Sequence, residues 1–300
     1  MSERKVTLGA DPELFLISSA TGEYVPAYGL IGGTKTKPLA LPGKPRGFFY
    51  QEDGAAFEFN IPEATTASSF TDRIQYAIQK SQQVLATSGL VLDLKNCAAE
   101  LTLTPAQLQH PFANMIGCSP DWDGFTNTQR HGIGAGLMGN KRFAGGHLHI
   151  GYDTSLMPRH VMAQHIDLLV YMPLSGYDAG LRSDRASLYG VPGVYRPKPY
   201  GIEYRRPSSF WLNNPILATG LARLTFAVVA RLLENIALTA KRYETWNLPR
   251  LQQLSSEGRA YEIRGELSDW DACHRCADEA LQYVVAYQAK SRALGDAAWA

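Results

Sequence analysis

A short glycine-flanked segment with strictly alternating residues, Gly145–Tyr152, most constrains how this chain can fold. Its sequence, GGHLHIGY, places two histidines two residues apart. Successive side chains of a β-strand point to opposite faces, so His147 and His149 share one face and the aliphatic residues share the other. A lone strand histidine is usually structural, but a pair between glycines, which admit a close ligand or backbone, also fits a binding site. Both interpretations stand until the rest of the chain is considered.

The same alternation recurs in three other segments. Asp11 and Glu13 lie in Leu8–Ile17, Glu58 and Asn60 lie in Ala55–Ile61, and Glu203 and Arg205 lie in Tyr200–Arg206. Apolar or aromatic residues occupy the intervening positions, so each strand presents its polar groups on one face. A merely solvated face would be rich in Lys, Thr, Ser and Gln, whereas these positions carry Asp, Glu, His, Asn and Arg. We therefore predict a shared acidic cavity that binds metal ions.

Length and composition limit the classes of protein that remain. The 300 residues, 45% of them hydrophobic, suffice for a sizeable core, and we predict one catalytic domain over residues 1–300 with a helical extension over 241–300. The 29 Lys and Arg nearly balance the 28 Asp and Glu, so nucleic acid is not an expected partner. The first residues lack an apolar signal core, and the most apolar segment, Ile216–Leu238, contains charges, so neither export nor a membrane span is expected.

Cysteine usage is sparse and favours a reducing compartment. Four cysteines in a chain of this length do not make a disulfide framework. The motif Cys273–Cys276 has no second CxxC partner, and we interpret it as chance rather than as a zinc or redox site. We therefore expect a cytoplasmic protein.

Residue periodicity predicts a mixture of strands and helices. Strands are expected at Val6–Ser19, Gly47–Ile61 and Val91–Leu103, in addition to those around His147 and Glu203, with a turn at Glu52–Gly54 inside the second segment. Helices are expected at Ser68–Thr87, Pro158–Tyr177, Asn213–Arg242 and Asp269–Ser291. Glycine- and proline-rich loops are expected at Tyr28–Arg46 and Leu181–Tyr200.

Both predicted loops are basic. The first carries Lys35, Lys37, Lys44 and Arg46, and the second carries Arg182, Arg185, Arg196 and Lys198. Spacing alone favours a solvated hairpin tip for the first loop over a cationic arm above a phosphate. The second loop directly precedes the strand of Glu203 and Arg205, so its arginines are candidates for the site.

The acidic strands, if they converge, define a particular chemistry. Asp11, Glu13, Glu58 and Glu203 would repel one another strongly unless cations neutralised them. Oxygen-rich ligand sets with one imidazole suit Mg²⁺ or Mn²⁺, which commonly serve nucleotide phosphates. Phosphoryl transfer also needs positive groups around the transferred phosphate, and Arg205 with the preceding arginines supplies them. The residues thus permit a phosphoryl-transfer site built from metal ions and arginines.

These motifs together carry a resemblance. Gly9–Leu16 (GADPELFL) resembles the opening acidic strand of the glutamine synthetase and glutamate–cysteine ligase superfamily. Gly146–Gly151 resembles its histidine strand, and Ile202–Arg205 resembles its late Glu-x-Arg strand. From about residue 6 to 240, the chain resembles the phage-type carboxylate–amine ligases, or amidoligases. Two further segments, Gly33–Pro38 and Tyr195–Arg205, are similar to segments of the same branch.

The resemblance implies a fold and a reaction. The fold would be α+β, a curved antiparallel half-barrel with helices packed on its outer face. ATP, held by two or three Mg²⁺ or Mn²⁺ ions, would phosphorylate a carboxylate, and an amine would attack the acyl phosphate to give an amide or isopeptide. Partners would be small-molecule or peptide carboxylates and amines, with no nucleic acid or membrane, in the host cytoplasm if the gene is phage-borne.

The resemblance also implies roles for individual residues. The metal ligands would be Asp11, Glu13, Glu58, His147 and Glu203. Arg205 and Glu58 would be catalytic, and His149 would bind the cofactor. From the basic loops we add Arg185 as a catalytic candidate and, as candidates for cofactor binding, Lys35, Lys37, Arg182 and Arg196. The first acidic position is Asp rather than Glu, with Pro12 between the acidic pair, so the shorter ligand would shift that metal or require a bridging water.

Two other functions remain open at this point. A metal-dependent kinase or ATPase would stop at phosphoryl transfer and need no amine. A degenerate member would bind nucleotide or a phage partner only structurally, although every expected ligand type is present. The sequence leaves open whether the acceptor is a free amino acid, a peptide or protein, or a cell-wall precursor, and leaves the oligomeric state open as well.

Overall fold

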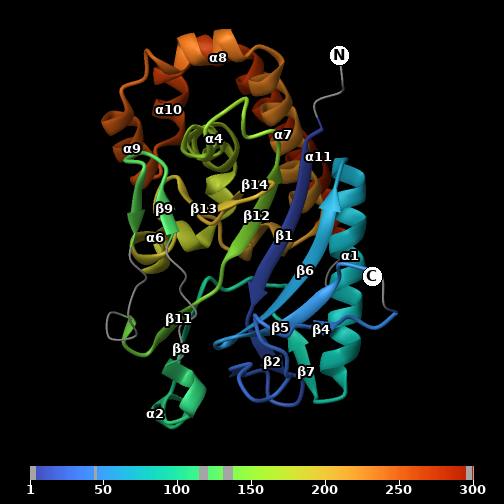
Figure 1. Ribbon diagram of the computed structural model, residues 1–300. Coiled ribbons are helices and arrows are strands. Elements are labelled where there is room, and N and C mark those ends of the chain that lie inside the picture. Colours follow the sequence, from blue (N-terminus) through green and yellow to red (C-terminus); the bar gives the residue numbers. More distant parts are fainter. Residues whose placement is uncertain (1–4, 44–45, 115–120, 131–137, 295–298, 300) are drawn as a thin grey trace.

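An open nine-stranded antiparallel sheet organises the computed structural model, which describes residues 5–43, 46–114, 121–130, 138–294 and 299 (Figure 1). In spatial order its strands are β10 (Thr128–Arg130), β9 (Asp121–Asp123), β13 (Val194–Lys198), β14 (Gly201–Tyr204), β12 (Gly146–Gly151), β1 (Thr7–Leu14), β6 (Ala56–Ala64), β5 (Phe49–Asp53) and β4 (Leu39–Ala40). Two small sheets accompany it, β3 (Tyr24–Val25) with β2 (Leu16–Ser18) and β7 (Leu90–Leu92), and β11 (Lys141–Phe143) with β8 (Glu100–Thr102).

Helices cover one face of the large sheet. The longer ones are α1 (Ala67–Ala86), α4 (Arg159–Ile166), α7 (Pro215–Glu234), α8 (Ile236–Tyr243), α9 (Leu248–Ser256), α10 (Ala260–Glu266) and α11 (Asp271–Leu294). Helix α1 packs on β6 and α7, α4 packs on β13 and β14, and α11 packs on α7. The chain is therefore a mixed α/β protein with a large open antiparallel sheet.

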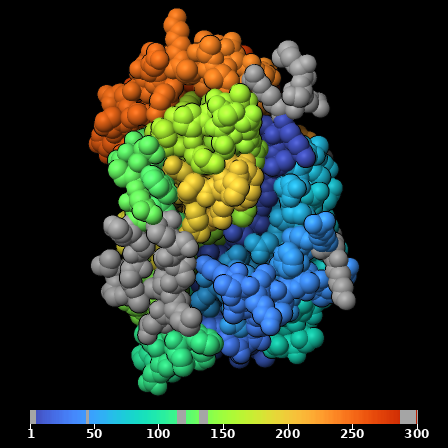
Figure 2. Space-filling view, viewed as in Figure 1, coloured from blue at the N-terminus to red at the C-terminus, as the bar shows by residue number. Residues whose placement is uncertain are grey.

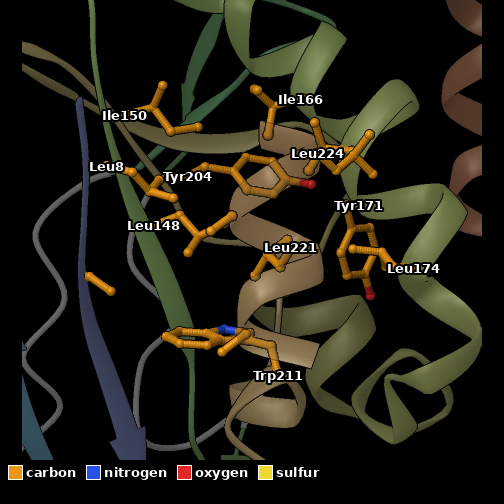
Figure 3. Close-up of a cluster of buried hydrophobic side chains, with 14 of the residues drawn as sticks. Leu8, Leu148, Ile150, Ile166, Tyr171, Leu174, Tyr204, Trp211, Leu221 and Leu224 are labelled. Atoms are coloured by element: carbon orange, nitrogen blue, oxygen red, sulfur yellow. The ribbon is translucent and has the colours of Figure 1, made fainter. Parts of the chain in front are cut away.

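The alternation in the central strands decides which face is the core. Leu8 in β1, Leu148 and Ile150 in β12, and Tyr204 in β14 are fully buried. Figure 3 shows them together with Trp211 and the α7 residues Leu221 and Leu224. The residues between these positions, which are the predicted site residues, point to the opposite face because the side-chain period of a strand is two.

The predicted strand Val91–Leu103 is wrong in its middle. The segment forms two short strands, β7 and β8, in different small sheets. Between them the carboxylate of Asp93 accepts hydrogen bonds from the backbone N–H of Asn96 (3.0 Å) and Ala98 (3.1 Å) and from the Tyr24 hydroxyl (2.8 Å). An aspartate that binds nearby backbone groups favours a turn over a continuous ladder.

The predicted long helix Asn213–Arg242 is divided in two. It begins at Pro215, after the Asn214 cap, and ends at Glu234. Asn235 then caps α8, because its side chain accepts a hydrogen bond from Leu238 N (3.0 Å). Helix α7 is long and apolar enough to cross a membrane by length and composition, but it lies in the core against α1 and α11, as expected of a buried helix.

The predicted loop Leu181–Tyr200 is also partly wrong, since it contains a short helix, α6 (Arg185–Leu188), and strand β13. Strand β13 pairs with β14 and β9. Pro197 lies inside β13, and proline in a strand interior argues against a strand from sequence alone. Strand β13 matters for the site, because it places Arg196 directly opposite Glu203.

A buried histidine lies among aromatic rings beneath the sheet. The ring of His165 in α4 is fully buried, 4.5 Å from the Trp246 ring and 5.1 Å from the Trp270 ring, centroid to centroid. Its Nδ1 lies 2.7 Å from the Val161 carbonyl oxygen. Burial lowers the pKa of His165 to about 4, so the folded protein holds a neutral imidazole.

This burial predicts acid sensitivity. The pKa of His165 in the fold, about 4, is below the ordinary histidine value of about 6.5, so unfolding takes up a proton between these pH values. Stability should therefore be unaffected by this group above pH 6.5 and fall towards pH 4, by up to about 3 kcal/mol. In urea unfolding at pH 7 and pH 4.5, His165→Gln should show a smaller loss of stability than the wild type. An equal loss in both proteins would contradict this assignment.

Candidate active site

The register of the central strands places the predicted site residues side by side on one face. Asp11 lies opposite His147, Glu13 lies opposite Glu58, and Glu203 lies opposite both His149 and Arg196. Directly opposed residues of neighbouring strands point to the same face. A continuous row of polar side chains therefore crosses β6, β1, β12, β14 and β13.

A first triad of possible metal ligands consists of Asp11, His147 and Glu203, whose ligand atoms lie within 4.8 Å of one another. His147 Nδ1 lies 3.5 Å from Asp11 Oδ1 and 3.9 Å from Glu203 Oε1. Burial and the Arg205 guanidinium lower the pKa of His147 to about 4, so its imidazole is neutral, the form that binds metals. Although burial and Asp11 oppose it, the guanidinium groups of Arg205 and Arg196 lower the pKa of Glu203 to about 2.

A second triad consists of Glu13, Asp53 and Glu58, again with ligand atoms within 4.8 Å of one another. Burial and the neighbouring Asp53 raise the pKa of Glu13 to about 8. Burial, together with Asp11, Asp53 and Glu13, also raises the pKa of Glu58 well above its usual value. Raised carboxyl pKa values mean that the fold supplies too little positive charge here, which a divalent cation would add.

Asp53 is a site residue that the sequence analysis missed. It ends β5 just before the turn at Gly54, and the segment was interpreted only as a turn. A usable signal was present, because Gln51 and Asp53 alternate with Tyr50 and Glu52. Gln51 lies directly opposite Glu58 in the β5–β6 pair, so the residue two positions later shares the face of Glu58.

The two triads fit Mg²⁺ or Mn²⁺. Asp11 Oδ1 and Glu203 Oε2 are buried and, within the part of the chain that the structure describes, receive no well-directed hydrogen bond. His149 Nε2 and Lys198 Nζ lie 3.1 Å and 2.6 Å from these oxygens, respectively, as ion pairs. Buried carboxylates need opposing charge, and sets of carboxylates, with or without an imidazole, are the ligands that these cations accept.

Protein cations already neutralise part of this acidic face. Arg205 contacts Glu203, and its Nε lies 3.1 Å from Asp121 Oδ1. Arg196 bridges the same acids, 2.9 Å from Asp121 and 3.3 Å from Glu203. Lys198 pairs with Glu203 at 2.6 Å. Neither Asp121 nor Lys198 was among the predicted site residues, although Lys198 follows Arg196 by two positions and so shares its face.

His149 joins the first triad to an exposed aromatic ring. Its Nε2 lies 3.1 Å from Asp11 Oδ1, and its Nδ1 lies 2.8 Å from the Tyr200 hydroxyl. The two rings are stacked at 5.9 Å, and Tyr200 is 43% exposed. Burial opposes protonation of His149, but Asp11 raises its pKa above the usual value.

Arg185 supports the backbone that carries Arg205. It is buried, and its guanidinium donates to the carbonyl oxygens of Arg205 (3.1 Å), Arg206 (2.6 Å) and Pro207 (2.9 Å). Arg206 faces the core instead and pairs with the buried Asp167 at 2.8 Å. Arg185 also lines the cavity beside the second triad, so its predicted catalytic role stays a prediction.

The remaining predicted cofactor-binding residues lie in different surroundings. Lys35 reaches the second triad, with Nζ 2.9 Å from Asp53 Oδ2. Lys37 and Arg182 are exposed and form no ion pair with the site carboxylates among the described residues. Lys44, which the sequence analysis placed in the first basic loop, lies outside the described residues. The roles of Lys37 and Arg182 remain predictions.

Two cavities flank the polar row at different positions along β1 and β12. One is lined by Glu13, Asp53, His147, Arg205, Met138, Arg142, Phe143, Arg185 and Tyr189, among others. The other is lined by Thr7, Gly9, His149, Gly151, Tyr152 and Tyr200, among others. Figure 2 shows a hollow on this face between the gold β13–β14 hairpin and the blue N-terminal segments. The acidic row is thus bordered by cavities at two positions.

Comparison with known proteins identifies a family that resembles part of the chain. Residues 126–253 match the family model of the phage phiEco32-like COOH-NH2 ligases, type 2. This match confirms the resemblance to the phage-type carboxylate–amine ligases, and the family name is that of a ligase. The matched segment contains His147, His149, Glu203 and Arg205, whereas the second triad precedes it. No curated protein matches the chain.

Close packing at Gly146 generates a prediction. A Cβ there would overlap the Ser208 carbonyl oxygen and lie 2.5 Å from Trp211 Nε1. Gly146→Ala should therefore lower the free energy of unfolding by about 2 kcal/mol, because neither neighbour can retreat in a packed core. Urea unfolding measures this, with Gly265→Ala as the control, since a Cβ at Gly265 meets no atom within 4 Å. Equal effects of the two substitutions would show that the packing at Gly146 is looser than described.

Proposed function

We propose that this protein is an ATP-dependent carboxylate–amine ligase that forms an amide or isopeptide bond through an acyl-phosphate intermediate. The observation that carries the proposal is the pair of adjacent triads beside Arg205, in a chain that matches a COOH-NH2 ligase family. We further propose that the open sheet corresponds to the half-barrel of glutamine synthetase-like enzymes, with the site on its concave face.

Two or three Mg²⁺ or Mn²⁺ ions would be required. Asp11, His147 and Glu203 would hold one ion, and Glu13, Asp53 and Glu58 would hold another. Bound ions would neutralise the carboxylates and withdraw charge from phosphate oxygens. This assignment extends the metal ligands predicted from the sequence by Asp53.

The chain's own cations would orient the phosphate. Arg205 lies between Glu203 and Asp121, with its Nη1 3.3 Å from His147 Nδ1, so its charge is fixed beside the first triad. A fixed guanidinium is suited to stabilise the charge that develops on a transferred phosphoryl group. His149 would contact phosphate from the other side of the same triad.

The two cavities offer separate places for the reactants. The exposed ring of Tyr200 and the side-chain-free Gly9 and Gly151 favour the nucleotide in the cavity beside His149, since a nucleobase can stack on an aromatic ring. The carboxylate and amine would then occupy the cavity beside Glu13 and Arg205. A carboxylate oxygen would take the terminal phosphoryl group and release ADP. The amine nitrogen would next bond to the acyl carbon and release phosphate and a proton.

Substitution of one residue from each of two strands tests the first triad. Glu203→Gln and His147→Ala should each lower ATP turnover by at least about a hundredfold, because each removes a ligand of the metal ion that would lie beside the transferred phosphate. ADP release measures turnover, and circular dichroism checks the fold. Glu234→Gln is the matched control, since Glu234 is an exposed acid on α7 paired with Arg231. Turnover like that of the wild type in either site variant would remove that residue from its role.

A condensation screen separates ligation from the alternative reactions. Incubation with ATP, Mg²⁺ and mixtures of carboxylates and amines should give a product whose mass is the sum of both co-substrates less one water. Its formation should require protein, ATP and both co-substrates. A phosphorylated product formed without any amine would indicate a kinase or ATPase instead. Nucleotide binding without any turnover would indicate a structural, degenerate member.

A further inference from the structure

Each of the two triads has one lysine whose ammonium group lies against one of its carboxylates. Lys198 Nζ lies 2.6 Å from Glu203 Oε2 in the first triad, and Lys35 Nζ lies 2.9 Å from Asp53 Oδ2 in the second. The lysine side chains are 28% and 42% exposed, whereas the Glu203 side chain is 1% exposed. Both ammonium groups therefore reach, from the solvent side, a buried or partly buried carboxylate that belongs to a triad of possible metal ligands.

We propose that Lys35 and Lys198 are internal counter-ions that hold the two cation positions and are displaced when divalent ions bind. The proposal rests on the metal-binding part of the proposed function. An ammonium and a divalent ion on one carboxylate repel each other, so the two occupants exclude one another. The acidic face can in this way remain folded before any ion arrives.

The arginines of the site are poorly suited to the same exchange. Arg196 and Arg205 each bridge Asp121 and Glu203, and their side chains are 19% and 12% exposed. A planar guanidinium held by two carboxylates loses several fixed hydrogen bonds when it leaves. A lysine ammonium on a flexible side chain can instead rotate into water and become fully hydrated.

The backbone around Lys35 is anchored, so exchange requires only a side-chain rotation. The Glu52 carboxylate accepts hydrogen bonds from the backbone N–H of Gly29 (2.9 Å), Ile31 (3.0 Å) and Gly32 (2.8 Å). These bonds tie the loop that carries Lys35 to strand β5. Lys198 likewise lies on a paired strand, opposite Gly201.

Metal titration of lysine variants tests the exchange. Lys35→Met and Lys198→Met should each lower the Kd for Mn²⁺ by about tenfold, because the competing internal cation is gone. Binding is measured by calorimetry or by the electron paramagnetic resonance signal of free Mn²⁺. Lys37→Met is the matched control, since it removes the same charge from the same loop at an exposed residue. An unchanged Kd in both site variants, or an equal decrease in Lys37→Met, would overturn the proposal.

Chemical labelling of the wild-type protein provides a second readout that needs no substitution. Saturating Mn²⁺ should increase the acetylation of Lys35 and Lys198 by acetic anhydride several-fold and leave Lys37 unchanged, as measured by mass spectrometry. Labelling of Lys35 and Lys198 that stays constant or falls with Mn²⁺ would overturn the proposal. Both measurements omit ATP and co-substrates, so a failed ligation screen would leave their outcome standing, and their failure would leave the ligation result standing.

Discussion

The constraint that governs this structure is the mutual repulsion of acids on one face of an antiparallel sheet, which must be balanced for the sheet to form. Asp11, Glu13, Glu58 and Glu203 occupy neighbouring rungs of the ladder, while the opposite face of the same strands is closed by an apolar core. The acids cannot turn away, because a strand offers only two faces and the other one is packed. The fold therefore fixes a high density of negative charge that some cation must balance.

Protein side chains supply part of that balance, and they do so unevenly. The first triad lies among Arg205, Arg196 and Lys198, which keep the pKa of Glu203 low. The second triad has Lys35 beside it, and burial with neighbouring acids raises the pKa of Glu13 and Glu58. The cations that the sequence argument required are therefore supplied in part by the protein itself. The remaining deficit of positive charge lies mainly around the second triad.

The two-residue period made much of this arrangement predictable. It identified the faces of β1, β6, β12 and β14 and the acids they carry, because alternation is a local property. It could not supply the register, which places Asp11 opposite His147 and depends on contacts between distant segments. Strand β13 was missed because of Pro197, and Asp53 and Asp121 were missed because each lies at the end of a short strand. Local pattern thus identified the chemistry, whereas tertiary pairing chose the partners.

The place of β1 in the sheet has a consequence for biosynthesis. This strand lies between β6 and β12 in the sheet, yet it is synthesised well before β12. The edge of β1 that pairs with β12 therefore stays unpaired during part of translation. Unpaired strand edges are prone to pair with other chains and aggregate. Asp11 meets His147 only when that long closure is complete. Nascent chains would therefore lack the first triad until β12 and β14 have been synthesised.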